Sequence, residues 1–383
     1  MTGTRQLHTL QVGKGWFPEQ SGGLNRYYHE LLRHLPAAGV EVTGLVAGSE
    51  QVAAQSGGVV RPFAPSRASL PARLGRVRRL VRTELQQHPA SLFVTHFALY
   101  AAPCLDLLGD HPVVVHFHGP WSAESLTEGA STLAAGLKYW VEDAVYRRGA
   151  RFVVLSQAFG RLLAERHGVP TDRIRVIPGG VDTARFAPAE SRASARARLG
   201  WPQDRPIALV VRRLVRRMGL EDLIAAVELA RSAVPELLLV IAGTGPLAAE
   251  LERRAEGPVA PHVRFAGYLP DEDLPLAFRA ADLSVVPSVA LEGFGLIVAE
   301  SLAAGTPVLV TDVGGLPETV AGLSEACVVR ERGPHGIAAA LAAALRGTLA
   351  LPTASDCVQH ARQRFDWPVI AEQVRSAYAE ALT

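Results

Sequence analysis

The sequence has 383 residues, 48% of them hydrophobic, which is enough for two domains with separate cores. Its charges nearly cancel, at a formal +2, which argues against a nucleic-acid-binding protein. Nearly all the positive charge is arginine and alanine is abundant, a composition typical of a GC-rich bacterial source. The cysteines Cys104, Cys327 and Cys357 lie too far apart for a disulfide framework or a zinc site, so we expect a cytoplasmic protein.

The first half of the chain alternates predicted strands and helices. An amphipathic helix is expected at 24–35, after a turn-rich loop that contains Gly22 and Gly23. Strands are expected at 6–12, 41–46, 91–95, 113–116, 152–155 and 173–177. This alternation indicates a parallel sheet covered by helices on both faces.

The second half repeats the pattern after residues 182–203, which are rich in Ala, Arg and Pro and which we interpret as an interdomain linker. A helix is expected at 221–231, and strands at 207–211, 237–241, 263–265, 283–286 and 308–310. We therefore predict an α/β protein of two Rossmann-like domains, 1–185 and 186–365, with the ligand cleft at the carboxyl ends of the strands. The last segment, 366–383, is expected to form a helix that returns to the first domain.

The stretch from Glu292 to Val308 predicts a loop, a helix that begins near Gly295, a turn and a strand. Free backbone N–H groups and the helix dipole at such a start bind a phosphate or another anion. Glu292 lies just outside this helix and Glu300 inside it, and ionised carboxylates accept hydrogen bonds from the paired hydroxyls of a sugar or ribose. The alternative is an ordinary helix with two surface glutamates.

Five short motifs, in this order, resemble those of glycosyltransferase family 4. They are residues 22–26, residues 176–182, Arg213-Leu214 with Met218-Gly219, residues 243–247 and residues 292–300. The resemblance covers nearly the whole chain. It implies the GT-B fold, with two Rossmann-like domains facing a central cleft, and transfer of a hexose-type sugar from a nucleoside-diphosphate sugar with retention of configuration. It also implies that neither a metal nor another cofactor is needed, that UDP is slightly favoured over GDP, and that the acceptor is a hydroxyl of a small molecule, a polysaccharide or a lipid.

The resemblance assigns catalytic roles to three residues. Glu292 matches the family glutamate that contacts the transferred sugar, and Arg213 matches the arginine that meets the diphosphate. His118 matches the histidine of the acceptor-side loop. Fixed positive charge suits a leaving diphosphate when no metal is present.

The donor-binding residues that the resemblance implies lie in both halves of the chain. Gly22 and Gly23 would close over the phosphates, with Arg26 adding charge, and Glu300 would bind the ribose hydroxyls. Residues 268–269 would contact the base through main-chain atoms. The full set is Gly22, Gly23, Arg213, Arg217, Gly243, Tyr268, Leu269, Glu292, Gly293, Phe294, Gly295, Leu296 and Glu300.

The chain departs from the family at three positions. Met218 stands where lysine is usual, so Arg216 or Arg217 would have to supply the second phosphate-binding charge, and we favour Arg217. Gly180 stands where asparagine is common. Gly119 follows His118 where many members have aspartate, so no neighbouring carboxylate is expected to orient the histidine.

Four other interpretations of charged or glycine-rich stretches compete with these assignments. The arginines of 212–217 are alternatively a solvated helix face, and Asp271-Glu272-Asp273 resembles a metal-binding pair but suits a helix N-terminus. Residues 243–248 fit a dinucleotide fingerprint, yet Pro246 and the absence of a suitable acid argue against NAD. The basic amphipathic helix at 73–82 predicts a solvated face, with weak contact to a membrane surface as the alternative.

Three further alternatives concern the role of His118 and the function of the protein. His118 is alternatively structural, because His96 and His116 also lie at strand ends. A GT-B-fold nucleotide-sugar epimerase and a non-catalytic nucleotide-sugar-binding protein are the alternatives to a transferase, the second suggested by Met218.

Overall fold

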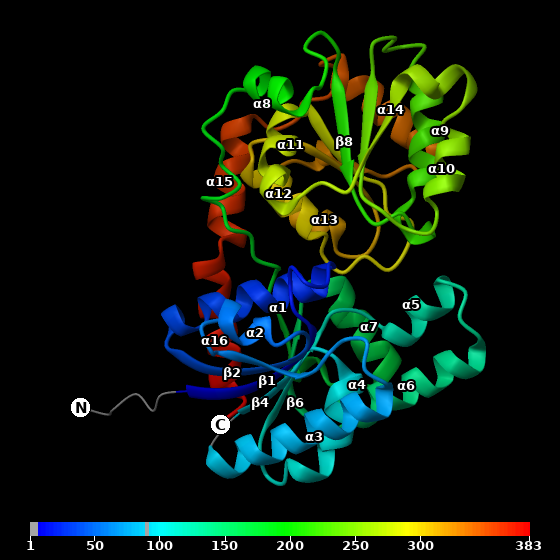
Figure 1. Cartoon of the computed structure of the whole chain (residues 1–383). Helices are drawn as coiled ribbons and strands as arrows, with labels where there is room; N and C mark the ends of the chain where they lie inside the picture. Colours follow the sequence, from blue (N-terminus) through cyan, green and yellow to red (C-terminus); the bar gives the residue numbers. More distant parts are fainter. Residues whose placement is uncertain (1–6, 89–91) are drawn as a thin grey trace. The chain divides into compact units, whose positions relative to one another are not determined.

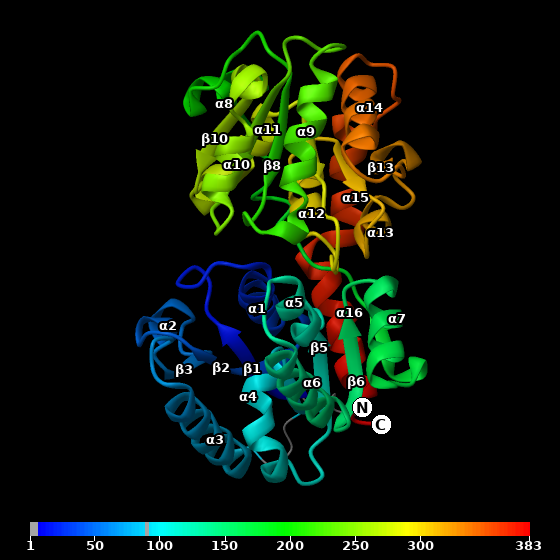
Figure 2. The same ribbon diagram turned by 90° about the vertical axis from the view of Figure 1, so that its right-hand side faces the viewer.

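The computed structural model describes residues 7–88 and 92–383. Gln6 and Ser91, each at the start of a predicted strand, lie outside the described residues. The chain divides into two compact units, the first formed by residues 1–180 with 367–383 and the second by 181–366. Each unit has its own parallel sheet flanked by helices (Figures 1 and 2), which confirms the predicted α/β class with two Rossmann-like domains.

Within the described residues, the sheet of the first unit has seven parallel strands in the order β3-β2-β1-β4-β5-β6-β7. Its strands are β1 (Leu7–Gly15), β2 (Val40–Ala47), β3 (Val60–Ala64), β4 (Leu92–Thr95), β5 (Val113–Phe117), β6 (Gly149–Val154) and β7 (Ile174–Val176). The sequence predicted all of them except β3. That strand contains Pro62, which lowers the strand propensity of its segment but is tolerated because β3 lies at the edge of the sheet.

The helices of the first unit include a C-terminal one that is distant in sequence from the rest. They are α1 (Gly23–His34), α2 (Gln51–Gln55), α3 (Leu70–Gln87), α4 (Ala98–Ala101), α5 (Trp121–Thr127), α6 (Thr132–Tyr146), α7 (Gln157–His167) and α16 (Trp367–Glu380). Helix α16 packs against α1 and β6. In α3, Arg73 donates to Tyr100 and Arg78 to Pro103 and Asp106 of the same unit, so these two arginines of the basic helix have partners within the protein. No helix in the described part of the chain is long and apolar enough to cross a membrane.

Trp367, at the start of α16, explains one departure from the family pattern. Its indole is buried and stacks on His34 at 5.5 Å between ring centroids. A Cβ atom added to Gly180 would lie 2.4 Å from Cδ2 of this indole, which is closer than real Cβ contacts. Glycine at position 180 therefore makes room for Trp367, and an asparagine would not fit without a shift.

The sheet of the second unit has six parallel strands within the described residues, in the order β10-β9-β8-β11-β12-β13. Its strands are β8 (Ile207–Val211), β9 (Leu238–Ala242), β10 (Val263–Gly267), β11 (Leu283–Val286), β12 (Val308–Thr311) and β13 (Val328–Val329). Its helices are α8 (Arg192–Leu199), α9 (Leu220–Ala230), α10 (Ala248–Arg254), α11 (Leu274–Ala280), α12 (Leu296–Ala303), α13 (Leu316–Val320), α14 (Pro334–Leu345) and α15 (Ala354–Phe365). The two-residue edge strand β13 was not predicted.

The interpretation of residues 182–203 as a linker is wrong, because the second unit begins at Val181 and contains these residues. Helix α8 begins after Ser191, whose hydroxyl accepts from the Ser194 N–H. Arg196 in α8 is 5% exposed, pairs with Asp282 at 2.6 Å and also donates to three backbone carbonyls. These bonds fasten the segment to the sheet of the second unit, which its charged and alanine-rich composition did not reveal.

All three cysteines are free and buried. Burial raises the pKa of Cys104 to about 12, that of Cys327 to about 11 and that of Cys357 to about 12. All three thiols are therefore uncharged at neutral pH.

The strand orders locate one topological switch point in each sheet. In the first sheet β1 lies between β2 and β4, so the connections from β1 and from β4 leave in opposite directions. In the second sheet the same holds for β8 and β11. Loops that follow the carboxyl ends of such strand pairs diverge and leave a crevice, which is where open α/β sheets bind ligands.

Candidate active site

The switch point of the second unit brings together the loops that follow β8 and β11. Gly219, after the first of these strands, adopts a φ of 69°. A Cβ atom there would lie 1.9 Å from the carbonyl oxygen of Pro287, after the second. Glycine is required because the turn is left-handed and the two backbones nearly touch.

A buried ion pair joins these two loops. The guanidinium of Arg212 pairs with the carboxylate of Glu292, and the two side chains are only 7% and 13% exposed. Nη2 of Arg212 also donates to Ser288 Oγ at 2.8 Å, and the Ser288 hydroxyl donates to Oε2 of Glu292 at 3.1 Å. Nε of Arg212 lies 3.1 Å from Sδ of Met218. The three polar residues form a closed network in which every member has a partner.

This network decides the charge state of Glu292. Burial by itself would raise the pKa of the carboxyl, but the charge and hydrogen bond of Arg212 outweigh it, with smaller contributions from Arg217 and Ser288. The net effect is a lowered pKa. Glu292 is therefore an ionised, acceptor-only group at neutral pH.

The other arginines of this segment have different environments. Arg217 is 8% exposed, and its Nη1 donates to the carbonyl of Leu291 at 3.0 Å. Leu291 has a φ of 50°, the only positive value at a non-glycine residue among those described. Arg213 and Arg216 are exposed, and Arg216 lies 3.6 Å from Glu250. A solvated face is thus wrong for Arg212 and Arg217. Arg217 supports the loop before Glu292, and its expected role toward phosphate stays a prediction.

The predicted helix start is observed: α12 begins at Leu296, after Gly295 with a φ of 78°, and no side chain caps it. Phe294 is 3% exposed and packs edge-on against Phe365 at 5.3 Å, so its ring anchors the loop in the core. The carbonyl of Glu292 accepts from the Gly315 N–H at 2.9 Å. These contacts fix the loop on both sides of Gly293 and leave the start of α12 without a side-chain cap.

The remaining predicted donor residues of this unit also follow strand ends or lie in α12. Gly243 follows β9 and packs against the Arg212 carbonyl, while Tyr268, 63% exposed, and Leu269 follow β10. Glu300 is buried within α12. Asp271, Glu272 and Asp273 form the short turn directly before α11, as the helix-start interpretation predicts, but none of their side chains caps the helix. The carboxylate of Asp271 pairs with Arg185 at 2.6 Å instead.

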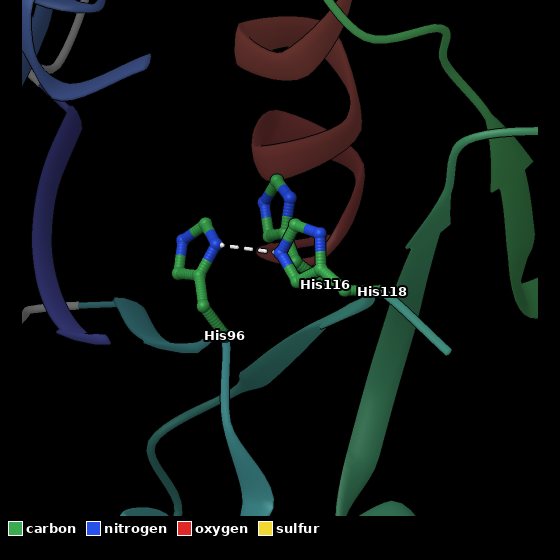
Figure 3. A group of neighbouring side chains, drawn as sticks. All are labelled: His96, His116 and His118. Carbon is green, nitrogen blue, oxygen red and sulfur yellow. Dashed lines mark hydrogen bonds between the residues drawn. The ribbon is translucent and has the colours of Figure 1, made fainter. Parts of the chain in front are cut away.

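The switch point of the first unit carries the other predicted residues. Gly22 precedes α1, which begins at Gly23, and no side chain caps this start. His96 follows β4, and His116 and His118 lie at the end of the neighbouring β5 (Figure 3). The loop after His118 is held by Glu142, whose carboxylate accepts from the Trp121 N–H at 2.7 Å.

The three imidazoles form one cluster with their neighbours. The rings of His96 and His116 stack at 4.2 Å between centroids, and Nδ1 of His96 lies 3.2 Å from Nε2 of His118 (Figure 3). Nε2 of His96 lies 3.1 Å from Oε1 of Gln11, and Nε2 of His116 lies 2.8 Å from the Tyr378 hydroxyl. Burial holds the pKa values of His96 and His116 well below the usual range and lowers that of His118 to about 3, so all three are neutral at neutral pH.

One nitrogen from each of these rings lies within 4.8 Å of the others, a spacing that is compatible with a bound metal ion. Both nitrogens of His96 already have partners, in Gln11 and His118. Both nitrogens of His116 face tyrosine hydroxyls, of Tyr378 at 2.8 Å and of Tyr27 at 3.4 Å. Protein groups thus account for the arrangement without an ion.

The predicted catalytic residues are divided between the units, with His118 in the first and Arg213 and Glu292 in the second. Sequence reasoning missed Arg212 and Ser288 as partners of Glu292. The available signal was a charged residue directly after the buried strand β8, in the same turn as the unexpected Met218. Gln11 was also missed, because it lies inside a strand and looks structural.

Comparison with known proteins accounts for most of the chain. Residues 21–185 match the family model "Glycosyltransferase Family 4" and residues 191–364 match "Glycosyl transferases group 1". A D-inositol 3-phosphate glycosyltransferase of Thermobispora bispora is 31% identical over 99% of this chain and 94% of its own length. A GDP-mannose-dependent α-(1-6)-phosphatidylinositol monomannoside mannosyltransferase of Mycolicibacterium smegmatis is 40% identical over 39% of this chain and 41% of its own length.

Among solved structures, the Anabaena protein HepE in complex with UDP-glucose superimposes with a TM-score of 0.78 over 97% of this chain and 99% of its own, at 19% identity. This likeness shows the fold, and the match to the Thermobispora relative over nearly the full length of both chains shows the family. The protein therefore belongs to glycosyltransferase family 4, has the GT-B fold, and is an enzyme that transfers a sugar from a nucleotide-sugar donor.

Proposed function

We propose that the protein is a retaining hexosyltransferase that works without a metal ion, with UDP-hexose as its first-choice donor. The observation that carries this proposal is the Arg212–Glu292 pair beside the uncapped start of α12. It joins fixed positive charge, free backbone N–H groups and an ionised carboxylate within one unit.

The diphosphate of the donor is assigned to the start of α12. Backbone N–H groups and the helix dipole favour an anion there. Arg213, exposed two positions after the end of β8, supplies the positive charge that a metal ion supplies in other transferases. Arg212 is already paired with Glu292, so its guanidinium positions the carboxylate rather than the diphosphate.

Glu292 is assigned to the hydroxyls of the transferred sugar. An ionised carboxylate accepts hydrogen bonds from adjacent sugar hydroxyls, and Arg212 keeps this one ionised although it is buried. In the reaction, the bond between the anomeric carbon and the diphosphate oxygen breaks while the acceptor oxygen bonds to the same face of the sugar. The acceptor proton passes to the departing phosphate oxygen, so no protein nucleophile is required.

The acceptor is assigned to the first unit, on the side of His118. The Thermobispora relative is named for inositol phosphate, which favours a hydroxyl of a phosphorylated polyol as the first acceptor to test. The likeness to HepE bound to UDP-glucose supports UDP, whereas the Mycolicibacterium relative, named for GDP-mannose, makes GDP the alternative.

The test is a matrix of two donors, UDP-glucose and GDP-mannose, each with and without inositol 3-phosphate, in the presence of EDTA. We expect release of UDP only when donor and acceptor are both present, and a product whose anomeric configuration by NMR matches that of the donor. Conversion of the donor without acceptor would indicate an epimerase. Binding of donor without any nucleotide release would indicate the non-catalytic alternative, and loss of activity in EDTA that Mg²⁺ restores would contradict metal independence.

A further inference from the structure

The hydrogen bonds that lead from β1 to His118 have a direction that the chemistry of each group determines. They begin at the carbonyl oxygen of Glu41, which can only accept, and the Thr9 hydroxyl donates to it at 3.2 Å. The Thr9 oxygen must then accept from the next group, the Gln11 side chain at 3.1 Å. The amide of Gln11 is therefore oriented with its nitrogen toward Thr9 and its oxygen toward His96.

The protonation of the two imidazoles follows from their neighbours in the same way. Oε1 of Gln11 can only accept, so Nε2 of His96, 3.1 Å away, carries a proton. A neutral imidazole has one N–H, so Nδ1 of His96 is an acceptor. Nε2 of His118, 3.2 Å from that atom, must donate to it (Figure 3). By the same count, Nδ1 of His118 keeps its lone pair.

The surroundings hold these rings in place. Tyr27 contacts His118 edge-on at 5.0 Å between centroids and Tyr28 contacts His96 edge-on at 4.9 Å. Gln11 and Thr9 are fully buried, and His96 is 2% exposed. His118 is only partly buried, and within the described parts of the chain its Nδ1 has no hydrogen-bond partner. Among the side chains of Thr9, Gln11, His96 and His118, the free lone pair therefore belongs to His118, the one that solvent or a ligand can reach.

We propose that Gln11 and His96 are positioning residues that fix His118 as its Nε2–H tautomer and so present the Nδ1 lone pair to the acceptor hydroxyl. This inference rests on the proposed function, because it places the acceptor beside His118. Many members of the family have an aspartate directly after this histidine, where this chain has Gly119. Here a neutral relay, the series of hydrogen bonds from Gln11 in β1 through His96 after β4, orients His118 instead.

The tautomer matters because it decides what the acceptor hydroxyl meets. Before the reaction the acceptor hydroxyl donates its hydrogen to Nδ1, which leaves its oxygen lone pairs free for attack on the anomeric carbon. As the bond to the diphosphate breaks, the proton passes from this hydrogen bond to the departing phosphate oxygen. The other tautomer would present an N–H, which donates to the hydroxyl oxygen and engages the electrons needed for attack. Losing the preferred tautomer should therefore lower kcat and leave KM for the donor nearly unchanged.

A matched pair of substitutions at His96 separates the relay from packing. Asparagine places its carbonyl oxygen near the position of Nδ1, so His96→Asn keeps an acceptor for His118. Glutamine places its amide nitrogen near the position of Nε2, so His96→Gln keeps the bond to Gln11 but offers His118 no acceptor. We expect kcat to fall by ~10-fold or more in His96→Gln and by at most ~3-fold in His96→Asn. Gln11→Glu, which keeps an acceptor for His96, is expected to resemble His96→Asn, and Gln11→Met to resemble His96→Gln.

The decisive readout is the tautomer itself, from long-range ¹H–¹⁵N spectra of the full chain with ¹⁵N-histidine, with His118 assigned by its disappearance in His118→Asn. We expect Nε2 of His118 to be protonated and Nδ1 bare at neutral pH, and a mixture of tautomers in His96→Gln. These spectra need no donor or acceptor. The predicted tautomer of His118 can therefore be tested even if the proposed substrates are wrong.

Three results would overturn the relay. The first is a wild-type His118 that is protonated at Nδ1. The second is an equal loss of kcat in both His96 variants with the His118 tautomer unchanged in folded protein, as judged by thermal unfolding. The third is a stoichiometric metal ion in the purified protein that is lost on substitution of His96, since the cluster would then be a metal site.

Discussion

Both switch points contain buried polar side chains, but these are stabilised in opposite ways. At the second one, opposite charges compensate, and Arg212 keeps Glu292 ionised against the effect of burial. At the first one, burial keeps three imidazoles neutral. His96 and His118 are hydrogen-bonded to each other, and further bonds run from His96 to an amide and from His116 to tyrosine hydroxyls, which leaves Nδ1 of His118 as the one imidazole nitrogen of the cluster without a partner among the described residues. A charged network tolerates small changes of geometry because Coulomb attraction falls off slowly with distance, whereas a neutral network depends on which atom carries each proton.

The difference suits the chemistry proposed for each unit. A leaving diphosphate and a sugar held by a carboxylate involve full charges. A hydroxyl that attacks needs a neutral acceptor with a defined lone pair. Substitutions at each switch point can test whether the charge at the second and the neutrality at the first are needed.

The largest effect is expected from Glu292→Gln, which keeps the shape of the side chain and removes its charge. Loss of the carboxylate should lower kcat/KM by roughly 10²- to 10³-fold, measured as acceptor-dependent nucleotide release. Glu252→Gln, at an exposed position of α10, is the control and should retain activity. Near-normal turnover in Glu292→Gln would show that the second switch point does not need its negative charge.

The next largest effect is expected on the stability of the protein when the ion pair is broken. Arg212→Met leaves Glu292 buried without its partner and should lower the free energy of unfolding by about 3 kcal/mol, measured in urea. The double substitution Arg212→Met with Glu292→Gln should recover most of that loss without recovering activity. If the double variant were no more stable than Arg212→Met, the cost would come from packing against Met218 and not from charge.

Acid should weaken the first switch point before the second. The pKa values of the three clustered histidines are lowered in the folded state, so the unfolded chain binds more protons once the pH falls below about 6.5. Their stabilising contribution is complete above that pH and decreases as the pH falls, for His118 down to about 3. Each proton taken up on unfolding steepens the slope by about 1.4 kcal/mol per pH unit.

The check is urea unfolding between pH 7.5 and 5.5. Because His8, His167 and His360 also have lowered pKa values, the whole protein gives a summed slope, and His118→Asn should reduce it. Glu292→Gln should leave the slope in this range unchanged, since the lowered pKa of Glu292 matters only below its unfolded value of 4.5. An equal slope in wild type and His118→Asn would contradict the neutral state of this imidazole.

The smallest effect is expected at Leu291, whose left-handed φ of 50° lies in the loop that Arg217 supports. Leu291→Gly should be tolerated, because glycine adopts this conformation without strain. Leu291→Val should lower the unfolding temperature, with a cost of about 1 kcal/mol, because a β-branched residue is disfavoured there. If valine were as stable as glycine, the positive φ would not persist in solution.

Much of the fold could be predicted from the sequence. Buried parallel strands are continuous apolar segments, and here they alternate with segments whose apolar residues have helical spacing. The pattern failed at β3, where Pro62 sits on an edge strand, and at residues 182–203, where Arg196 makes buried bonds that look like surface charge in a sequence. The composition of residues 182–203 does not show that Arg196 forms the buried hydrogen bonds that attach this segment to the second unit.

The candidate site was predictable where a local motif defines it, as at the start of α12. The partners of Glu292 were not, because Arg212 and Glu292 are 80 positions apart and meet only through the adjacency of β8 and β11. The same holds for Gln11 in β1, His96 directly after β4 and His118 directly after β5, since these three strands are neighbours in the sheet. Strand order, which no single motif encodes, decides these contacts.

The burial of the cysteines has a practical consequence. With all three native thiols uncharged and enclosed at neutral pH, alkylating probes that attack thiolates should leave them unmodified. A cysteine introduced at an exposed position would then be the single reactive thiol on the folded enzyme. Fluorophores and spin labels can therefore be attached at chosen sites without first deleting any native residue.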